Sequence, residues 1–205
     1  LDSLMRVLIN TGAAPGAQIC IVKDNCVVWN KAYGYHTYDQ TRPVDIQDLY
    51  DVASVTKVAA TTVSVMHLQD DGKIRIDSAM RLYVPELKNT NKSDLKVREI
   101  MAHHAALQAW IPFYQQTLSP QKMPSPDIYH PTPSGDFTVP VAPNLSMNRA
   151  WKDSIWQQIF RSDLRTTKAY KYSDLGLYLC ARAVQNLSGQ PVNDYARASF
   201  YQPLG

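Results

Sequence analysis

Long apolar runs are missing from this sequence, and so is a large excess of charge of either sign. No stretch approaches the roughly 18 consecutive apolar residues that would predict a membrane-spanning helix. The 21 Lys and Arg residues nearly balance the 18 Asp and Glu residues, giving a formal net charge of +3. Basic residues are scattered and never adjacent. We therefore expect no membrane span and no nucleic-acid partner.

Cysteine and histidine are also scarce, and their spacing argues against metal chemistry. Cys20, Cys26 and Cys180 cannot all pair, and no C-x-x-C spacing occurs. His103 and His104 are adjacent, so on a helix they would point about 100 degrees apart. Neither H-x-H-x-D nor H-E-x-x-H is present. Packing roles are favoured for both histidines, and we predict no metal site.

The chain has no initiator Met and no basic or apolar leader at its start. Either a leader has been removed or the chain begins inside a longer protein. Its 205 residues, 45% of them apolar, are enough for one sizeable domain or two small ones. We expect residues 1–205 to form a single, incomplete domain of mixed α/β (α+β) class.

Apolar spacing and breakers predict several helices and one hairpin. Asp2 would cap a helix through about Asn10. The helices expected further along cover 54–71, 94–104, 151–160 with Asn148 as its cap, 173–187, and a last one opened by Pro191. Strands 17–22 and 26–29 flank the turn Asp24-Asn25, a register that places Cys26 opposite Lys23 and Cys20 opposite Trp29. The two nearby cysteines should then stay unbridged.

Eight of the 13 prolines fall between residues 112 and 143. Because proline lacks an N–H group and fixes φ, this stretch is expected to be a long surface loop without regular structure.

Ser54-Val55-Thr56-Lys57 opens the most apolar of the predicted helices. Its apolar content lies on several sides, so we expect the helix to be buried in the middle of the domain; the residues at helical spacing are Val55, Val58, Ala59, Thr62, Val63 and Met66. A spacing of three places the hydroxyl and the amine on one helix face, about one turn apart. A partly desolvated lysine in that position can take the proton of the serine and make it a nucleophile. The alternative is that Ser54 merely caps the helix.

The same Ser-x-x-Lys pattern occurs at Ser93 and Ser119. Ser93 lies among polar residues and is read as the cap of a solvated helix. Ser119 precedes Pro120 in the proline-rich stretch, where a helical face is not expected. Only Ser54 follows an extended apolar approach, so it is the candidate nucleophile.

Tyr172 precedes the helix predicted for 173–187, so its phenol can project from a loop or a first turn. Without further context it reads as a half-buried tyrosine, with Ser173 or Asp174 as the helix cap.

Several runs together resemble the serine beta-lactamase-like and penicillin-binding-protein family, which includes class C beta-lactamases, D,D-peptidases and esterases. The runs are Leu49-Tyr50-Asp51-Val52-Ala53-Ser54-Val55-Thr56-Lys57, residues 68–77, Tyr83-Val84-Pro85-Glu86-Leu87, residues 100–107, Tyr172-Ser173-Asp174 and Phe200-Tyr201-Gln202-Pro203-Leu204-Gly205. They occur in the family's order over the whole chain. The resemblance implies a helical subdomain beside the N-terminal hairpin of an antiparallel sheet.

The resemblance also implies a mechanism. Ser54 would attack an amide, peptide or ester carbonyl, Lys57 and Tyr172 would share its proton, and the Ser54 N–H would form half of an oxyanion hole. No cofactor is implied. The partner would be a small-molecule or peptide substrate, and the location periplasmic or extracellular in a bacterium.

The sequence departs from the family pattern at several positions, and these departures leave functions other than hydrolysis open. Asp174 stands in a substrate-binding position where Asn is common, and an ionised carboxylate there favours a protonated Lys57. In the family, the residues after the histidine at position 103 usually read Thr-Ser-Gly-Leu, whereas here they are His104-Ala105-Ala106-Leu107. No Lys-Thr-Gly or His-x-Gly third motif occurs.

We therefore expect a fragment without its C-terminal strands, inactive alone or needing that missing portion as a partner. A slowly acylating binding or sensor module and a plain helical scaffold are the other hypotheses.

Overall fold

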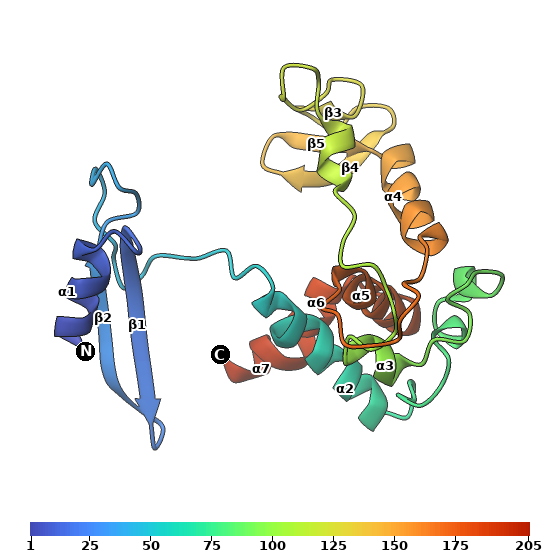
Figure 1. Ribbon diagram of the computed structural model, residues 1–205, viewed down its shortest axis with the longest axis horizontal. Helices are drawn as coiled ribbons and strands as arrows, with labels where there is room; N and C mark the ends of the chain where they lie inside the picture. The colour runs from blue at the N-terminus through green and yellow to red at the C-terminus, as the bar shows by residue number, and fades with distance from the viewer. The chain divides into compact units, whose positions relative to one another are not determined.

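The computed structural model describes residues 1–205 and contains two compact units, residues 1–53 and residues 54–205 (Figure 1). The single domain expected over residues 1–205 stays a prediction. None of the helices is both long enough and apolar enough to span a membrane.

The first unit is built on the predicted hairpin. Strands β1 (Gly16–Lys23) and β2 (Cys26–Gly34) pair antiparallel, and Lys23 faces Cys26 as predicted. Asp24 and Asn25 both have positive φ, the conformation that a two-residue hairpin turn requires. Cys20 and Cys26 are unbridged and exposed in this structure. Cys20, however, faces Asn30 rather than Trp29, because a bulge after Ile21 shifts the register by one residue.

Helix α1 (Asp2–Asn10) confirms the first predicted helix but not the capping role of Asp2. Leu1 occupies the N-cap position, and no side chain caps the helix. The Asp2 carboxylate instead accepts hydrogen bonds from Lys31 Nζ at 2.9 Å and from the Tyr33 hydroxyl at 2.8 Å. These contacts bring the start of α1 to β2.

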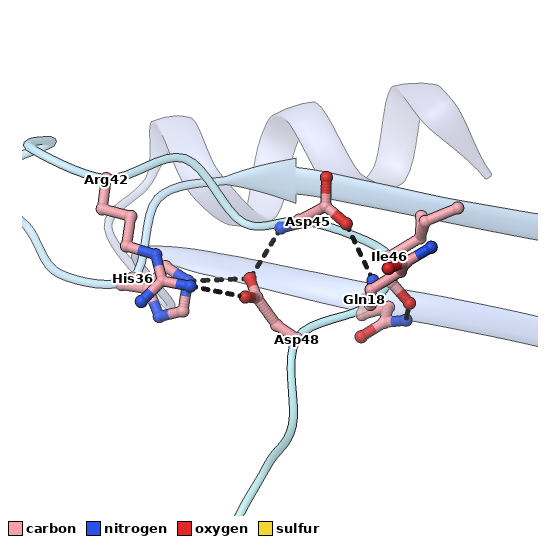
Figure 2. Close-up of polar contacts among 7 residues, drawn as sticks. Gln18, His36, Arg42, Asp45, Ile46 and Asp48 are labelled. Carbon is pink, nitrogen blue, oxygen red and sulfur yellow. Dashed lines mark hydrogen bonds and ion pairs between the residues drawn. The ribbon is translucent and has the colours of Figure 1, made fainter.

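A polar cluster holds the loop that follows the hairpin (Figure 2). The nearly buried carboxylate of Asp48 accepts hydrogen bonds from the Asp45 N–H at 2.7 Å, His36 Nε2 at 2.7 Å and the Arg42 guanidinium at 2.9 Å. The Asp45 amide, followed by His36 and Arg42, holds the pKa of Asp48 below its usual value. The Gln18 side chain donates to the Ile46 carbonyl and joins this loop to β1.

The second unit is mainly helical, with a small antiparallel sheet in the order β3-β5-β4. Its elements are η1 (Lys57–Thr62), α2 (Val63–Asp70), η2 (Met80–Leu82), η3 (Pro85–Leu87), α3 (Val97–Met101), η4 (Phe113–Thr117), β3 (Tyr129–His130), β4 (Phe137–Ala142), β5 (Leu145–Asn148), α4 (Arg149–Arg161), α5 (Asp174–Ser188), α6 (Val192–Ala196), η5 (Arg197–Tyr201) and α7 (Gln202–Leu204).

Helix α5 forms the centre of the core in this unit and confirms the helix predicted for 173–187. Seven of its residues are buried, and residues of α2, α3, α4 and α6 belong to the same apolar cluster. Gly176 allows the closest approach: a Cβ there would lie 3.0 Å from Ile100 Cγ2 and 3.3 Å from Leu107 Cδ1. The prediction of Asn148 as the cap of α4 is also confirmed, because its side chain accepts from the Ala150 N–H at 2.9 Å.

The helix expected to be buried on several sides is buried on one side only. The π-helical segment η1 leads directly into α2, and Thr61, Ser64, Val65 and Leu68 are buried. Val58 and Met66, predicted to share the inward spacing, are each 59% exposed. The π-helical turns place each residue less than 100 degrees after the previous one, so a face counted at 3.6 residues per turn is displaced.

The helix predicted for 94–104 is shorter than expected. Residues 91–94 form a turn and Lys96 is extended. The Leu95 carbonyl accepts from the Met80 N–H at 2.8 Å and Lys96 forms a bridge with Ala79, so the helix cannot begin before Val97. His103, with φ of +59°, lies beyond the C-terminal end. Leu95 and Ile100 are buried.

The prediction that residues 112–143 lack regular structure is wrong. This stretch contains η4, β3 and β4. Pro140 lies within β4, at an edge of the three-stranded sheet, where the missing N–H is tolerated.

A buried lysine stabilises the C-terminal end of α4. Lys92 has no exposed surface, and its Nζ donates to the Asn91 side chain at 2.8 Å, the Phe160 carbonyl at 3.2 Å and the Ser162 carbonyl. Carbonyl groups in the last turn of a helix lack intrahelical partners and attract positive charge. Burial lowers the pKa of Lys92 to about 8.

Candidate active site

Ser54 and Lys57 form the centre of the candidate site. The Ser54 carbonyl accepts from the Lys57 N–H at 3.0 Å, so the helical turn begins at the serine. Lys57 Nζ donates to Ser54 Oγ at 2.9 Å. Ser54 is solvent-exposed and Lys57 is partly buried. The spacing of three residues therefore brings the hydroxyl and the amine into direct contact on one face, as the sequence predicts.

Asp174 meets Lys57 from the first turn of α5. Its Oδ1 lies 2.8 Å from Lys57 Nζ, and the two side chains are 31% and 18% exposed. Oδ1 itself is buried, and its contact with Nζ is an ion pair without the angles of a good hydrogen bond. Burial alone would lower the pKa of Lys57. The contacts with Asp174 and Tyr172 outweigh burial and hold this pKa above its usual value.

Tyr172 completes the group of predicted site residues. Lys57 Nζ lies 5.1 Å from the centroid of the tyrosine ring. Polar contact with Ser54, followed by contact with Lys57, lowers the pKa of the Tyr172 phenol. A phenol that is half exposed and more acidic than usual can exchange protons with a neighbouring hydroxyl. The structure therefore brings Ser54, Lys57, Tyr172 and Asp174 together.

His103 is a member of the site that sequence reasoning did not place there. Its ring packs against that of Tyr172 with centroids 4.6 Å apart. Its Nδ1 accepts from the Ser173 N–H at 3.2 Å, and its carbonyl accepts from the Lys171 N–H at 2.9 Å. Burial, followed by the charge of Lys57, lowers the pKa of His103, so the neutral ring is favoured. His103 thus holds the residues on both sides of Tyr172.

Arg165 and the start of α5 attach the loop of residues 162–173, which carries Tyr172, to residues 106–109. The Arg165 N–H donates to the Ala106 carbonyl at 2.7 Å, and its guanidinium donates to the Leu107 carbonyl at 3.2 Å. The Asp174 N–H donates to the Ala109 carbonyl at 2.8 Å. The sequence analysis did not predict these contacts, although residues 100–107 form one of the runs that resemble the family.

The other two Ser-x-x-Lys patterns form no comparable arrangement. Ser93 accepts hydrogen bonds from Arg81 through its carbonyl and hydroxyl oxygens. Its predicted capping role is wrong, because the nearest helix begins only at Val97. The Ser119 hydroxyl accepts from the Met123 N–H at 3.4 Å in a turn where Lys122 has positive φ.

The site thus places a serine at a helix start, hydrogen-bonded to a lysine beside a tyrosine of lowered pKa, in a mixed α/β fold. A sequence model of the family described as Beta-lactamase matches residues 1–205. The chain belongs to the Beta-lactamase family.

Two curated relatives are bacterial. The N-acetylmuramyl-L-alanine amidase of Bacillus subtilis (strain 168) is 26% identical over 203 residues, which cover 93% of this chain and 41% of that protein. An Escherichia coli (strain K12) protein, provisionally named D-alanyl-D-alanine carboxypeptidase, is 28% identical over 211 residues, covering 93% and 42%. The chain therefore spans less than half the length of these relatives.

Among solved structures, a class C beta-lactamase has a TM-score of 0.69 at 21% identity. The match covers 100% of this chain and 48% of that one. At this identity the likeness shows the fold alone, and it confirms the predicted β-lactamase-like fold.

Proposed function

We propose that this chain carries the nucleophile of a serine hydrolase that forms an acyl-enzyme on an amide, peptide or ester. The contact of 2.9 Å between Lys57 Nζ and Ser54 Oγ, beside the Tyr172 phenol, carries the proposal. A serine hydroxyl becomes a useful nucleophile only when an adjacent group accepts its proton. The Tyr172 phenol and the Lys57 amine are the neighbours of Ser54.

The proton route follows from the charges around Ser54. Asp174 favours the protonated form of Lys57, while Lys57 and Ser54 together favour ionisation of Tyr172. Tyr172, as the phenolate that the Lys57 ammonium stabilises, therefore takes the Ser54 proton as Oγ attacks the carbonyl carbon. The same proton then passes to the departing amine or alcohol. Water next attacks the Ser54 ester, releases the acid and returns a proton to Ser54.

The negative oxygen of the tetrahedral intermediate forms beside the start of a helix. The first N–H groups of a helix have no intrahelical acceptor and present partial positive charge. We assign the Ser54 N–H as one donor to this oxygen, as in other acyl-transfer sites.

The substrate class is an amide or peptide in preference to an ester. Both curated relatives carry names that refer to amide bonds, one to N-acetylmuramyl-L-alanine and one to D-alanyl-D-alanine. A periplasmic or extracellular location in a bacterium is part of this proposal.

A slowly acylating binding or sensor module is the second candidate function. The ion pair of 2.8 Å between Lys57 and Asp174 favours it, because an ammonium held by a carboxylate cannot accept a proton. Under this alternative Ser54 would acylate slowly and the adduct would persist.

Labelling with a fluorophosphonate and a fluorescent penicillin tests both candidates. The matched variants are Ser54→Ala, which removes the candidate hydroxyl, and Ser119→Ala, which removes a serine of the same sequence pattern outside the site. Labelling that is lost in Ser54→Ala and kept in Ser119→Ala supports Ser54 as the acylated residue. Release of the penicillin label within minutes favours the hydrolase, and a stable label favours the binding module. Equal labelling of the Ser54→Ala variant would contradict both.

A further inference from the structure

A cavity of about 690 Å³ lies between β4 and α4 in the second unit. Figure 1 shows α4 beside the small sheet to which β4 belongs, and residues of the two elements are in contact. Ligand pockets in proteins span about 300–1,000 Å³ and combine apolar walls with a few polar groups. The cavity therefore has room for a small organic molecule or for the end of a peptide.

The cavity is separate from the candidate active site. Ser54, Lys57 and Tyr172 do not line it. Arg182 lines it and follows Asp174 by eight residues on α5. Arg182 therefore lies about 12 Å further along the helix axis and is turned about 80 degrees from Asp174. A ligand in this cavity would lie outside the group of residues around the candidate nucleophile.

One wall of the cavity is aromatic and is fixed before any ligand binds. Trp156 stacks on Phe160 with ring centroids 5.7 Å apart and an interplanar angle of 23°. Phe160 is buried, so the stack is supported from behind. Val139 and Pro140 line the cavity from β4. A preformed apolar surface of this kind lowers the cost of binding an aromatic or branched apolar group.

Arg182 supplies a cation that is held in place beside this wall. Its Cζ lies 5.3 Å from the centroid of the Trp156 ring. Its Nε and Nη2 donate to Glu86 Oε1 at 3.3 Å and 2.7 Å. A guanidinium has five N–H donors, and the contacts with Glu86 use two of them. A held guanidinium with donors to spare suits the planar geometry of a carboxylate.

Lys152 supplies a second cation near the same ring. It precedes Trp156 by four residues on α4, so the two side chains share one helix face. Lys152 is exposed, whereas Glu86 is already paired with Arg182. The lining contains three basic residues and two acidic ones, which gives a net charge of +1. The positive charges near Trp156 therefore match a ligand with one negative charge.

We propose that this cavity binds a carboxylate carried on an aromatic or branched apolar group. The carboxylate accepts hydrogen bonds from Arg182 and Lys152, and the apolar group packs between Trp156 and β4. A free aryl acid and the C-terminal residue of a peptide share this chemistry. The inference goes beyond the proposed hydrolase and does not rest on acylation of Ser54.

Titration of the chain with 3-phenylpropanoate tests the proposal. Binding is followed by the methyl NMR signals of Val139, which lines the cavity from β4 and is assigned with Val139→Ile. A ligand of this size should bind with a Kd on the order of 1 mM. The uncharged 3-phenylpropanamide should bind at least roughly tenfold more weakly, because it offers Arg182 no charged acceptor. Unmoved Val139 signals, or equal Kd values for the acid and the amide, would overturn the proposal.

Two variants test the cations separately. Arg182→Gln should raise the Kd for 3-phenylpropanoate roughly ten- to hundredfold. Lys152→Gln should raise it roughly two- to fivefold, because an exposed ion pair is weaker. Lys88→Gln, which removes an exposed positive charge outside the cavity, is the matched control and should bind as the wild type does.

Lys152→Gln keeps the test decisive if Arg182→Gln does not fold, because Lys152 is an exposed residue. Equal Kd values for Lys152→Gln and Lys88→Gln would overturn the proposal. N-acetyl-phenylalanine then separates the two sources of the ligand. Binding tighter than that of 3-phenylpropanoate identifies a peptide end, because its amide adds polar contacts, and equal or weaker binding identifies a free aryl acid.

Discussion

Replacing Asp174 with Asn removes the carboxylate that pairs with Lys57 and keeps the size of the side chain. The paired atoms are 2.8 Å apart. At a separation of this order, the attraction of two unit charges is about 1.5 kcal/mol in water and about 6 kcal/mol at an effective dielectric constant of 20. Both side chains are partly exposed, so the lower value is the better guide. About 1.5 kcal/mol corresponds to a roughly tenfold larger fraction of neutral Lys57.

The expected outcome is faster acylation of Ser54 at neutral pH, with the rising limb of the pH–rate profile moved to lower pH. The sign is the same for either base. Without the carboxylate the pKa of Lys57 falls, and because the Asp174 charge raises the pKa of Tyr172, that pKa falls as well. The result is measured as the pseudo-first-order rate of fluorophosphonate labelling across pH.

Asp127→Asn, at an exposed position of the proline-rich stretch, is the matched control and should leave the profile unchanged. A rising limb that stays in place or moves to higher pH in Asp174→Asn, with an unchanged circular dichroism spectrum, would refute the proton route given above.

Two further predictions concern His103 and Lys92. His103→Asn keeps a residue type that tolerates positive φ but removes the ring beside Tyr172. Labelling of Ser54 should therefore slow roughly ten- to hundredfold, whereas the control His104→Asn should label at the wild-type rate. Equal labelling rates in the two variants would exclude a positioning role for His103. For Lys92, a folded pKa of about 8 against 10.5 means that the unfolded chain binds more protons between these pH values, so the stability of the wild type rises with pH there. Urea denaturation should show this rise, up to about 3 kcal/mol, in wild type but not in Lys92→Met; parallel slopes would contradict it.

Local sequence signals predicted the hairpin and most helices. The errors arise where contacts between residues far apart in the sequence determine the local structure. Asp24-Asn25 fixes the turn by itself, but the bulge after Ile21 leaves no mark in the alternation of a hairpin with both faces largely exposed. Pro140 argued against a strand because the sequence does not reveal which strand is an edge. The extended Lys96 before Val97 is likewise set by pairing with Ala79.

The site divides in the same way. The contact between Ser54 and Lys57 is a property of one helical turn, so the spacing alone predicts it. Tyr172 and Asp174 come from a distant segment, and only the ordered resemblance to a family brought them to the site. The packing of His103 on Tyr172 depends on two loops meeting, for which the sequence carries no periodic signal.

The turn at Ala106 has a consequence for the whole site. Family members commonly have glycine in this turn, yet Ala106 keeps a φ of +56°, a left-handed conformation that costs an L-residue roughly 1–2 kcal/mol. Arg165 opposes this strain through its bonds to the carbonyls of Ala106 and Leu107. The same segment continues to Ala109, whose carbonyl anchors the first N–H of α5. An arginine that has no contact with Lys57 in this structure therefore governs where the partner carboxylate of that lysine lies, and its loss would disturb the charge balance at the serine from a distance.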